Sequence, residues 1–102
     1  MYVVEIFLPL AADGGPPFPS DAYAALREQM TQTFGGVTAF TRAPAKGLWK
    51  DEQNRVQRDD VVIFEVMTPS IDREWWTGLR KRLEQTFKQK EVLIRAHAVE
   101  KV

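Results

Sequence analysis

Two segments of this chain are similar, with five of nine residues identical, at an offset of 53 positions. The letters LREQMTQTF at 26–34 return as LRKRLEQTF at 79–87. When residues 26–43 are aligned with 79–96, seven of the eighteen positions are identical, where chance would give about one. The sequence therefore predicts an internal duplication.

The duplication extends toward the start of each half. VVEIFLP at 3–9 matches IFEVMTP at 63–69, and both runs are rich in the β-branched and aromatic residues that strands favour. Each half is thus predicted to be a strand, a helix and a strand, with copies at about 2–43 and 61–99. We expect residues 1–102 to form one α+β domain, a ferredoxin-like βαββαβ sandwich. Its antiparallel sheet has the order 4-1-3-2, with both helices on one face.

Each predicted helix has one apolar stripe. Its members recur every three to four residues: Tyr23, Leu26, Met30 and Phe34, then Trp76, Leu79, Leu83 and Phe87. Ser20 is the expected N-cap of the first helix, and Gly35 is expected to end it in a left-handed conformation. The second helix is predicted at about 71–89, with Ser70 or Asp72 as its cap.

Composition excludes several functional classes. The chain has no cysteine and one histidine, so disulfides and thiolate chemistry are excluded, and neither a metal nor a cofactor is predicted. Fourteen basic residues balance fourteen acidic ones, which argues against nucleic acid as a partner. The apolar runs are too short for a membrane span, and the N-terminus lacks the pattern of a secretory signal. We expect a cytoplasmic protein that does not associate with membranes.

One face of the predicted sheet is not covered by helices, and strand alternation makes it apolar. The residues expected on this open face are Val3, Phe7, Phe40, Val61, Ile63, Met67 and Leu93. A contiguous apolar surface of this kind is seldom left in water. We therefore expect a homodimer in which two open faces pack together around a barrel-like interior.

With this architecture the chain resembles the dimeric α+β-barrel superfamily. FGGVTAF at 34–40, GLW at 47–49 and FKQKEVLIR at 87–95 are also similar to motifs of a bacterial family of small uncharacterised domains. The superfamily includes cofactor-independent monooxygenases, isomerases and stress-responsive proteins, so the resemblance implies a fold and a dimer. It assigns no catalytic residue to this chain.

Charged residues are also expected on the open face. Glu5 and Glu65 lie on the predicted central strands, and Arg42 and Arg95 lie at repeat-matched positions on the flanking strands. We expect Arg95 to pair with Glu5 and Arg42 with Glu65, because a buried carboxylate needs a partner. Two interpretations remain. The set is a structural ion-pair network, or it is a ligand site at which an arginine binds an anion and Glu65 or His97 moves a proton.

Two aromatic residues complete the predicted ligand site. Phe40 lies on the open face, and Trp49 lies in the polar segment between the second and third strands. Trp49 is expected to act as a lid over a cavity or as an arm of the dimer.

The leading interpretation is a homodimeric domain that binds a small aromatic or anionic molecule at the open face, in a pocket beside the charged residues. One alternative is a cofactor-independent enzyme of the monooxygenase or isomerase type. Another is a structural or regulatory dimer without a ligand.

Overall fold

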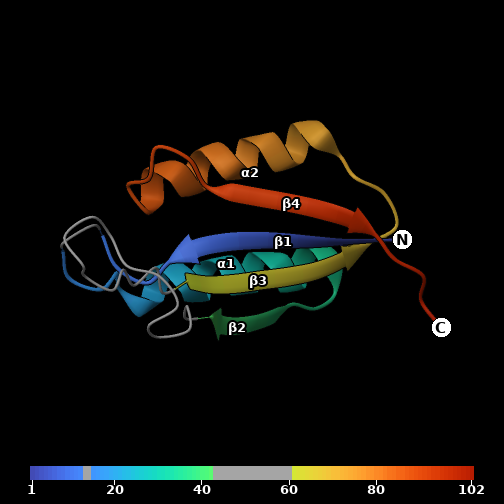
Figure 1. Cartoon of the computed structure of the whole chain (residues 1–102), viewed down its shortest axis with the longest axis horizontal. Coiled ribbons are helices and arrows are strands. Elements are labelled where there is room, and N and C mark those ends of the chain that lie inside the picture. The colour runs from blue at the N-terminus through green and yellow to red at the C-terminus, as the bar shows by residue number, and fades with distance from the viewer. Residues whose placement is uncertain (13–14, 43–60) are drawn as a thin grey trace, which may run out of the picture.

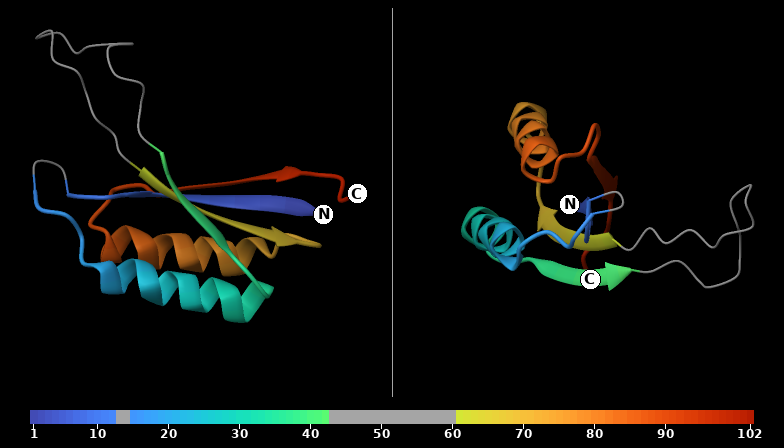
Figure 2. Two further views of the ribbon diagram at one scale, coloured as in Figure 1. Left: turned by 90° about the horizontal axis from the view of Figure 1, so that it is seen from below. Right: turned by 90° about the vertical axis from the view of Figure 1, so that its left-hand side faces the viewer.

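The computed structural model describes residues 1–12, 15–42 and 61–102. In chain order it contains β1 (Tyr2–Pro9), α1 (Ser20–Phe34), β2 (Thr38–Arg42), β3 (Val61–Thr68), α2 (Arg73–Thr86) and β4 (Leu93–Ala98). The strands form one antiparallel sheet in the order β2-β3-β1-β4, and both helices lie on the same face of it (Figures 1 and 2). The predicted ferredoxin-like fold and strand order are confirmed. Neither helix of the described chain is long and apolar enough to cross a membrane.

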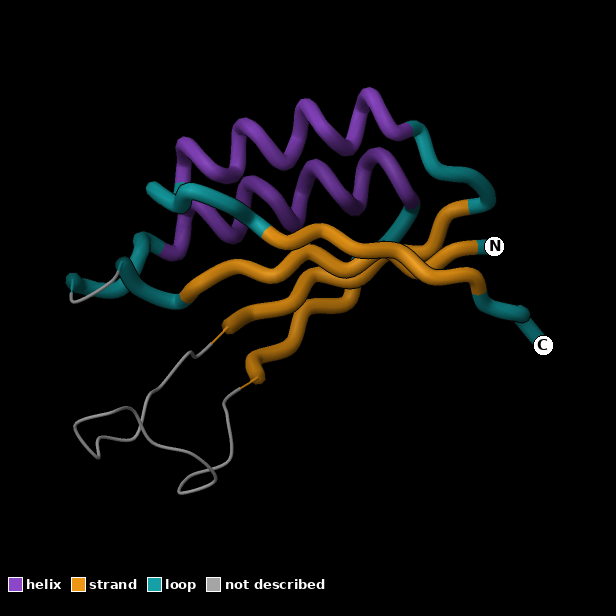
Figure 3. Tube along the Cα trace, turned by 45° about the horizontal axis from the view of Figure 1, so that its top comes forward, coloured by secondary structure: helices purple, strands orange, loops and turns teal. Residues whose placement is uncertain are grey.

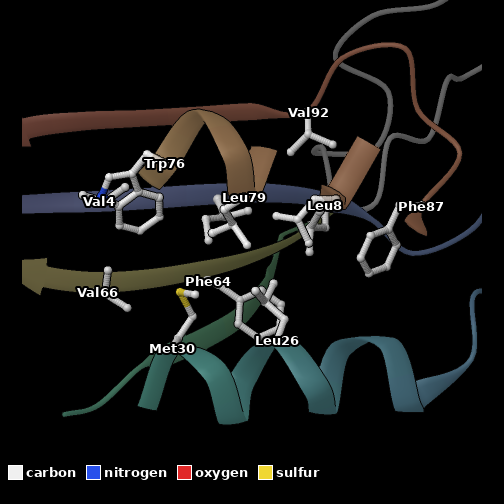
Figure 4. Packing of buried hydrophobic residues seen from close by; sticks show 12 residues of the cluster. Val4, Leu8, Leu26, Met30, Phe64, Val66, Trp76, Leu79, Phe87 and Val92 are labelled. Atoms are coloured by element: carbon white, nitrogen blue, oxygen red, sulfur yellow. The ribbon is translucent and has the colours of Figure 1, made fainter. Parts of the chain in front are cut away.

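The core lies between the sheet and the two helices, which run side by side across it (Figure 3). Strand alternation turns every second residue toward the helices, and the repeated helical stripe meets these residues (Figure 4). The buried cluster consists of Val4, Ile6, Leu8, Leu26, Met30, Phe64, Val66, Trp76, Leu79, Leu83, Phe87 and Val92. Both predicted stripes therefore face the core, although Tyr23 and Phe34 lie at its margin and are only half-buried.

An aromatic contact joins the last turn of α1 to the first turn of α2. The Phe34 ring stacks on Trp76, with centroids 5.2 Å apart and planes inclined by 17°. Trp75 packs edge-on against Phe34, with a centroid distance of 5.4 Å.

At the other end of α1, the Tyr23 hydroxyl donates to the Pro9 carbonyl at the end of β1. Burial raises the pKa of Tyr23 above its ordinary value, because the charged phenolate loses hydration there.

The two helices begin differently. Asp72 is the N-cap of α2, and its carboxylate accepts a hydrogen bond of 3.2 Å from the backbone N–H of Trp75. In α1 the cap position is occupied by Pro19, which makes no side-chain cap. The prediction of Ser20 as a cap was therefore wrong, because Ser20 is already the first helical residue. Gly35 ends α1 with φ of 81°, as expected for a left-handed C-cap.

The caps predict different responses to the same substitution. Asp72→Ala is expected to lower the free energy of unfolding by about 1 kcal/mol, because it leaves a backbone donor without its partner. Ser20→Ala is the matched control, and its effect is expected to stay within about 0.5 kcal/mol, as at other exposed positions. Urea denaturation of the two variants measures both values. Equal losses would show that the Asp72 cap does not stabilise α2.

The duplication predicts the register of β4 correctly but not that of β2. Glu5 lies opposite Arg95, as expected, whereas Glu65 lies opposite Thr38 and Arg42 lies opposite Val61. The connection after the helix explains the difference. Only residues 35–37 separate α1 from β2, whereas residues 87–92 separate α2 from β4. The shorter connection brings the chain into the sheet earlier, so β2 is displaced by four residues from the register predicted by the repeat.

Candidate functional site

The open face of the sheet is organised in rows that run across all four strands. One row contains, in strand order, Thr38, Glu65, Glu5 and Arg95. We call it the polar row. The neighbouring row contains Phe40, Ile63, Phe7 and Leu93. We call it the apolar row. On the other side of the polar row lie Met67, Val3 and His97. The charged groups are therefore bordered on both sides by apolar side chains.

Arg95 and Glu5 form the best-defined contact of the polar row. The Nε–H of Arg95 donates to Oε1 of Glu5 at 3.0 Å. The guanidinium carbon also lies 4.8 Å from the centroid of the Phe7 ring, within reach of a cation–π interaction. The Glu5 side chain is only 13% exposed, whereas that of Arg95 is 56% exposed. The predicted pairing of Arg95 with Glu5 is confirmed.

Glu65 lies directly opposite Glu5 on the neighbouring central strand. Such cross-strand partners have Cα atoms about 4.5–5.5 Å apart, and like charges there destabilise the sheet. Among the described residues, Glu65 has no hydrogen-bond or ion-pair partner. Two carboxylates and one guanidinium give the polar row a formal charge of −1 when all three are ionised. The row is therefore better suited to a cation than to an anion.

The structure brings some of the predicted site residues together and separates others. His97 Nδ1 lies 3.9 Å from Glu5 Oε1, close enough for a charge interaction but not for a hydrogen bond. Phe40 lies in the apolar row, one row from Glu65. The predicted pairing of Arg42 with Glu65 was wrong, because the displaced β2 places Arg42 opposite Val61. Trp49 lies outside the described residues.

Three members of this surface were not predicted as site residues from the sequence. Thr38 enters the polar row because of the displaced register, which the repeat could not reveal. Phe7 and Met67 were assigned to the open face by strand alternation, without a role beside the charged groups. Their positions two residues along the strand from Glu5 and Glu65 were a usable signal, because alternate residues of a strand share a face.

A double-mutant cycle tests the ion pair. Arg95→Gln is expected to lower the free energy of unfolding, and the coupling to Glu5→Gln is expected to be about 0.2–1 kcal/mol, because the arginine is largely hydrated. Urea denaturation of both single variants and of the double variant gives the coupling energy. A coupling indistinguishable from zero would mean that the contact does not stabilise the fold.

Among the described residues, no group of three or more histidine and acidic side chains could hold a metal ion. A groove of about 200 Å³ lies between α2 and β4. Its lining includes Val4 and Ile94 from the helix-facing side of the sheet, and Trp76 from α2. This groove is therefore not the pocket expected beside Glu5, Glu65 and His97.

Comparison with known proteins identifies related folds but no family. No family model and no curated protein matches the sequence. Among solved structures, a phage SAM lyase in complex with S-methyl-5'-thioadenosine is similar, with a TM-score of 0.61 and 15% sequence identity. The alignment covers 94% of this chain and 79% of that one. A phage SAM lyase in its apo state gives a TM-score of 0.57, 15% identity, and coverage of 94% and 78%.

These comparisons correct the functional interpretation drawn from the sequence. The leading interpretation, a homodimeric domain that binds a small aromatic or anionic molecule at the open face, is contradicted, because the similar structures are those of an enzyme. Of the interpretations considered, the enzyme alternative agrees better with this finding. The resemblance to the dimeric α+β-barrel superfamily is confirmed only as far as a small α+β sheet domain. At 15% identity the similarity establishes the shared fold.

Proposed function

We propose that this protein is an enzyme that cleaves a sulfonium substrate of the S-adenosylmethionine type, with the polar row as its reaction site. The observation that carries the proposal is the pair Glu5 and Glu65, which lie opposite each other on the central strands, while the arginine of the row, Arg95, contacts Glu5 from the edge strand. The fold shared with phage SAM lyase over 94% of this chain supports the choice of substrate class.

The chemistry of a sulfonium ion fits this surface. A sulfonium centre carries a full positive charge, but it has no N–H or O–H with which to donate a hydrogen bond. It is therefore stabilised by carboxylates and by the faces of aromatic rings. The open face offers Glu65, with no counterion among the described residues, and the rings of Phe7 and Phe40 in the adjoining row. Net negative charge beside aromatic side chains is the arrangement that attracts an organic cation.

Cleavage of such a substrate needs neither water nor a redox partner. When the bond between sulfur and the methionine-derived chain breaks, its electron pair returns to sulfur and neutral S-methyl-5'-thioadenosine leaves. The bond breaks as the carboxylate of the four-carbon chain attacks the carbon that leaves sulfur, which forms a lactone, or as a proton is removed from the adjacent carbon, which forms an alkene. Glu65 binds the cation in both routes. In the second route it also accepts the proton as general base.

The first test measures whether the protein forms this product. Purified protein is incubated with S-adenosylmethionine, and S-methyl-5'-thioadenosine is quantified by mass spectrometry against a protein-free blank, because the sulfonium compound also decays spontaneously. We expect product well above the blank. S-adenosylhomocysteine, an uncharged thioether, is the matched control and should remain intact. Formation of S-methyl-5'-thioadenosine at the rate of the blank would overturn the proposal.

The surface around the polar row leads us to propose a homodimer as well. Phe40, Met67 and Leu93 are 41%, 41% and 49% exposed, and together with Phe7 they flank the charged residues. A second open face packed on this one would cover these side chains and enclose a substrate. Analytical ultracentrifugation is expected to show a dimer that dissociates in the Phe40→Glu variant. A wild-type monomer at micromolar concentration would contradict this assembly.

A further inference from the structure

The groove between α2 and β4 differs in character from the open face. Its floor is apolar and consists of Val4, Trp76, Ile94 and Ala96. Val4 and Trp76 belong to the buried cluster, and Ile94 packs against that cluster, so the floor is fixed by the core. β4 is an edge strand, and α2 lies along it (Figure 1). The groove thus lies on the helix-covered side of the sheet, whereas the polar row lies on the other side.

The side of the groove that α2 forms is basic. Arg73, Thr77 and Arg80 line it from α2, and their spacing of four and three residues places them on one stripe of the helix. The two arginines are separated by about 10 Å along the helix axis, at 1.5 Å per residue. The lining residues include Arg95 as well, but its guanidinium contacts Glu5 on the opposite face. No acidic residue lines the groove.

Arg80 is held in place by a carboxylate that is itself anchored. Arg80 Nη1 lies 3.5 Å from Glu84 Oε2, and the same oxygen accepts a hydrogen bond of 3.0 Å from the backbone N–H of Val92. Glu84 thereby connects α2 to the segment that leads into β4. A guanidinium has five N–H donors, so this contact leaves several available for a ligand. Arg80 is thus partly oriented before any ligand binds.

We propose that this groove is a second binding site, for a small organic carboxylate whose apolar body is about the size of one aromatic ring. The carboxylate would be bound by Arg80 and Thr77, because a guanidinium fork matches two carboxylate oxygens and a hydroxyl can donate to either. The apolar body would lie on Trp76 and Ile94. A volume of about 200 Å³ is below the roughly 300–1,000 Å³ of sites for drug-sized ligands, which sets the size of the ligand.

The experiment follows backbone amide shifts of the full chain in ¹H–¹⁵N spectra during titration with sodium benzoate. We expect saturable shifts at Thr77, Ile94 and Ala96. Benzamide, which has nearly the same shape but no charge, should bind about tenfold more weakly or worse. Arg80→Gln should weaken benzoate binding about tenfold, and Arg73→Gln should weaken it less. Arg82→Gln is the matched control, because Arg82 is exposed on the same helix and does not line the groove.

The inference fails if benzoate and benzamide bind equally, if Arg80→Gln and Arg82→Gln behave alike, or if benzoate causes no saturable shift. Shifts confined to Phe7, Glu65 and Met67 would also overturn it, because they would place the anion on the open face. The outcome can be separated from that of sulfonium cleavage, because the two sites lie on opposite sides of the sheet and the test variants leave Arg95, which borders both, unchanged.

Discussion

Glu65→Gln is expected to reduce the kcat/KM for cleavage of S-adenosylmethionine by about 10²–10⁴-fold. Glutamine keeps the size of the side chain but removes its negative charge and its ability to accept a proton. Because Glu65 is half-buried and has no counterion among the described residues, the polar row would lose the charge that pairs with the sulfonium ion. The fold should be retained, since the substitution also removes a like-charge pair with Glu5.

Steady-state kinetics with two controls make this prediction specific. Glu100→Gln replaces an exposed acid that follows β4 and should leave the kinetics unchanged. Glu5→Gln should have a smaller effect, because the Glu5 charge is already paired with Arg95. A raised KM with an unchanged kcat would indicate that Glu65 only binds the cation, whereas a lowered kcat would indicate that it also accepts the proton. Unchanged kcat and KM in Glu65→Gln would show that Glu65 is not part of the reaction site.

Phe64→Ala is expected to lower the free energy of unfolding by about 3–5 kcal/mol. Phe64 is completely buried on β3, between the sheet and the helices. Removing its ring leaves a cavity that the close-packed neighbours cannot fill. In a domain of this size the loss corresponds to a fall in melting temperature of roughly 12 °C or more.

Phe40→Ala provides the matched comparison, because it removes the same ring from the open face, where Phe40 is 41% exposed. At protein concentrations at which the proposed dimer is dissociated, we expect this loss of stability to be less than half that of Phe64→Ala, because Phe40 is partly exposed in the single chain and no buried cavity forms there. Calorimetry of both variants gives the two melting temperatures. A similar fall in both would show that the open face is packed as tightly as the helix-covered core, and would contradict the placement of a single core between the sheet and the helices.

The sequence predicted those parts of the fold that depend on periodicity. The repeated spacing of apolar residues identified both helices, and alternation assigned Glu5 and Phe7 of β1 to the open face. Both patterns are local, because each follows from the geometry of a single element. The contact between Glu5 and Arg95 was predicted correctly because β4 has the register that the repeat predicts.

The register of β2 could not be predicted in the same way. It depends on where the chain enters the sheet after α1. β2 begins at Thr38, whose counterpart Glu91 precedes β4, although the two segments align without a gap. The displacement by four residues exchanged Arg42 for Thr38 opposite Glu65, which changed the expected formal charge of the row from neutral to −1. With Arg42 in place the row would be neutral and suited to an anion. With Thr38 it is negative and suited to a cation.

The groove beside α2 was missed for a different reason. Arg73, Thr77 and Arg80 have the spacing of a single helix stripe, but solvent-exposed helix faces carry such charges routinely. Only the position of α2 along the edge strand β4 shows that this stripe borders a groove with an apolar floor. That position is a property of the tertiary structure and leaves no separate pattern in the sequence.

The most direct test of the polar row as the reaction site is to map where S-methyl-5'-thioadenosine, the product expected of sulfonium cleavage, binds to the isotope-labelled protein. We predict that the largest changes in backbone amide shifts occur at Glu5, Phe7, Glu65 and Met67. Changes confined to Thr77 and Arg80 in α2, or the absence of any change at millimolar product, would contradict the assignment of the reaction site to the polar row.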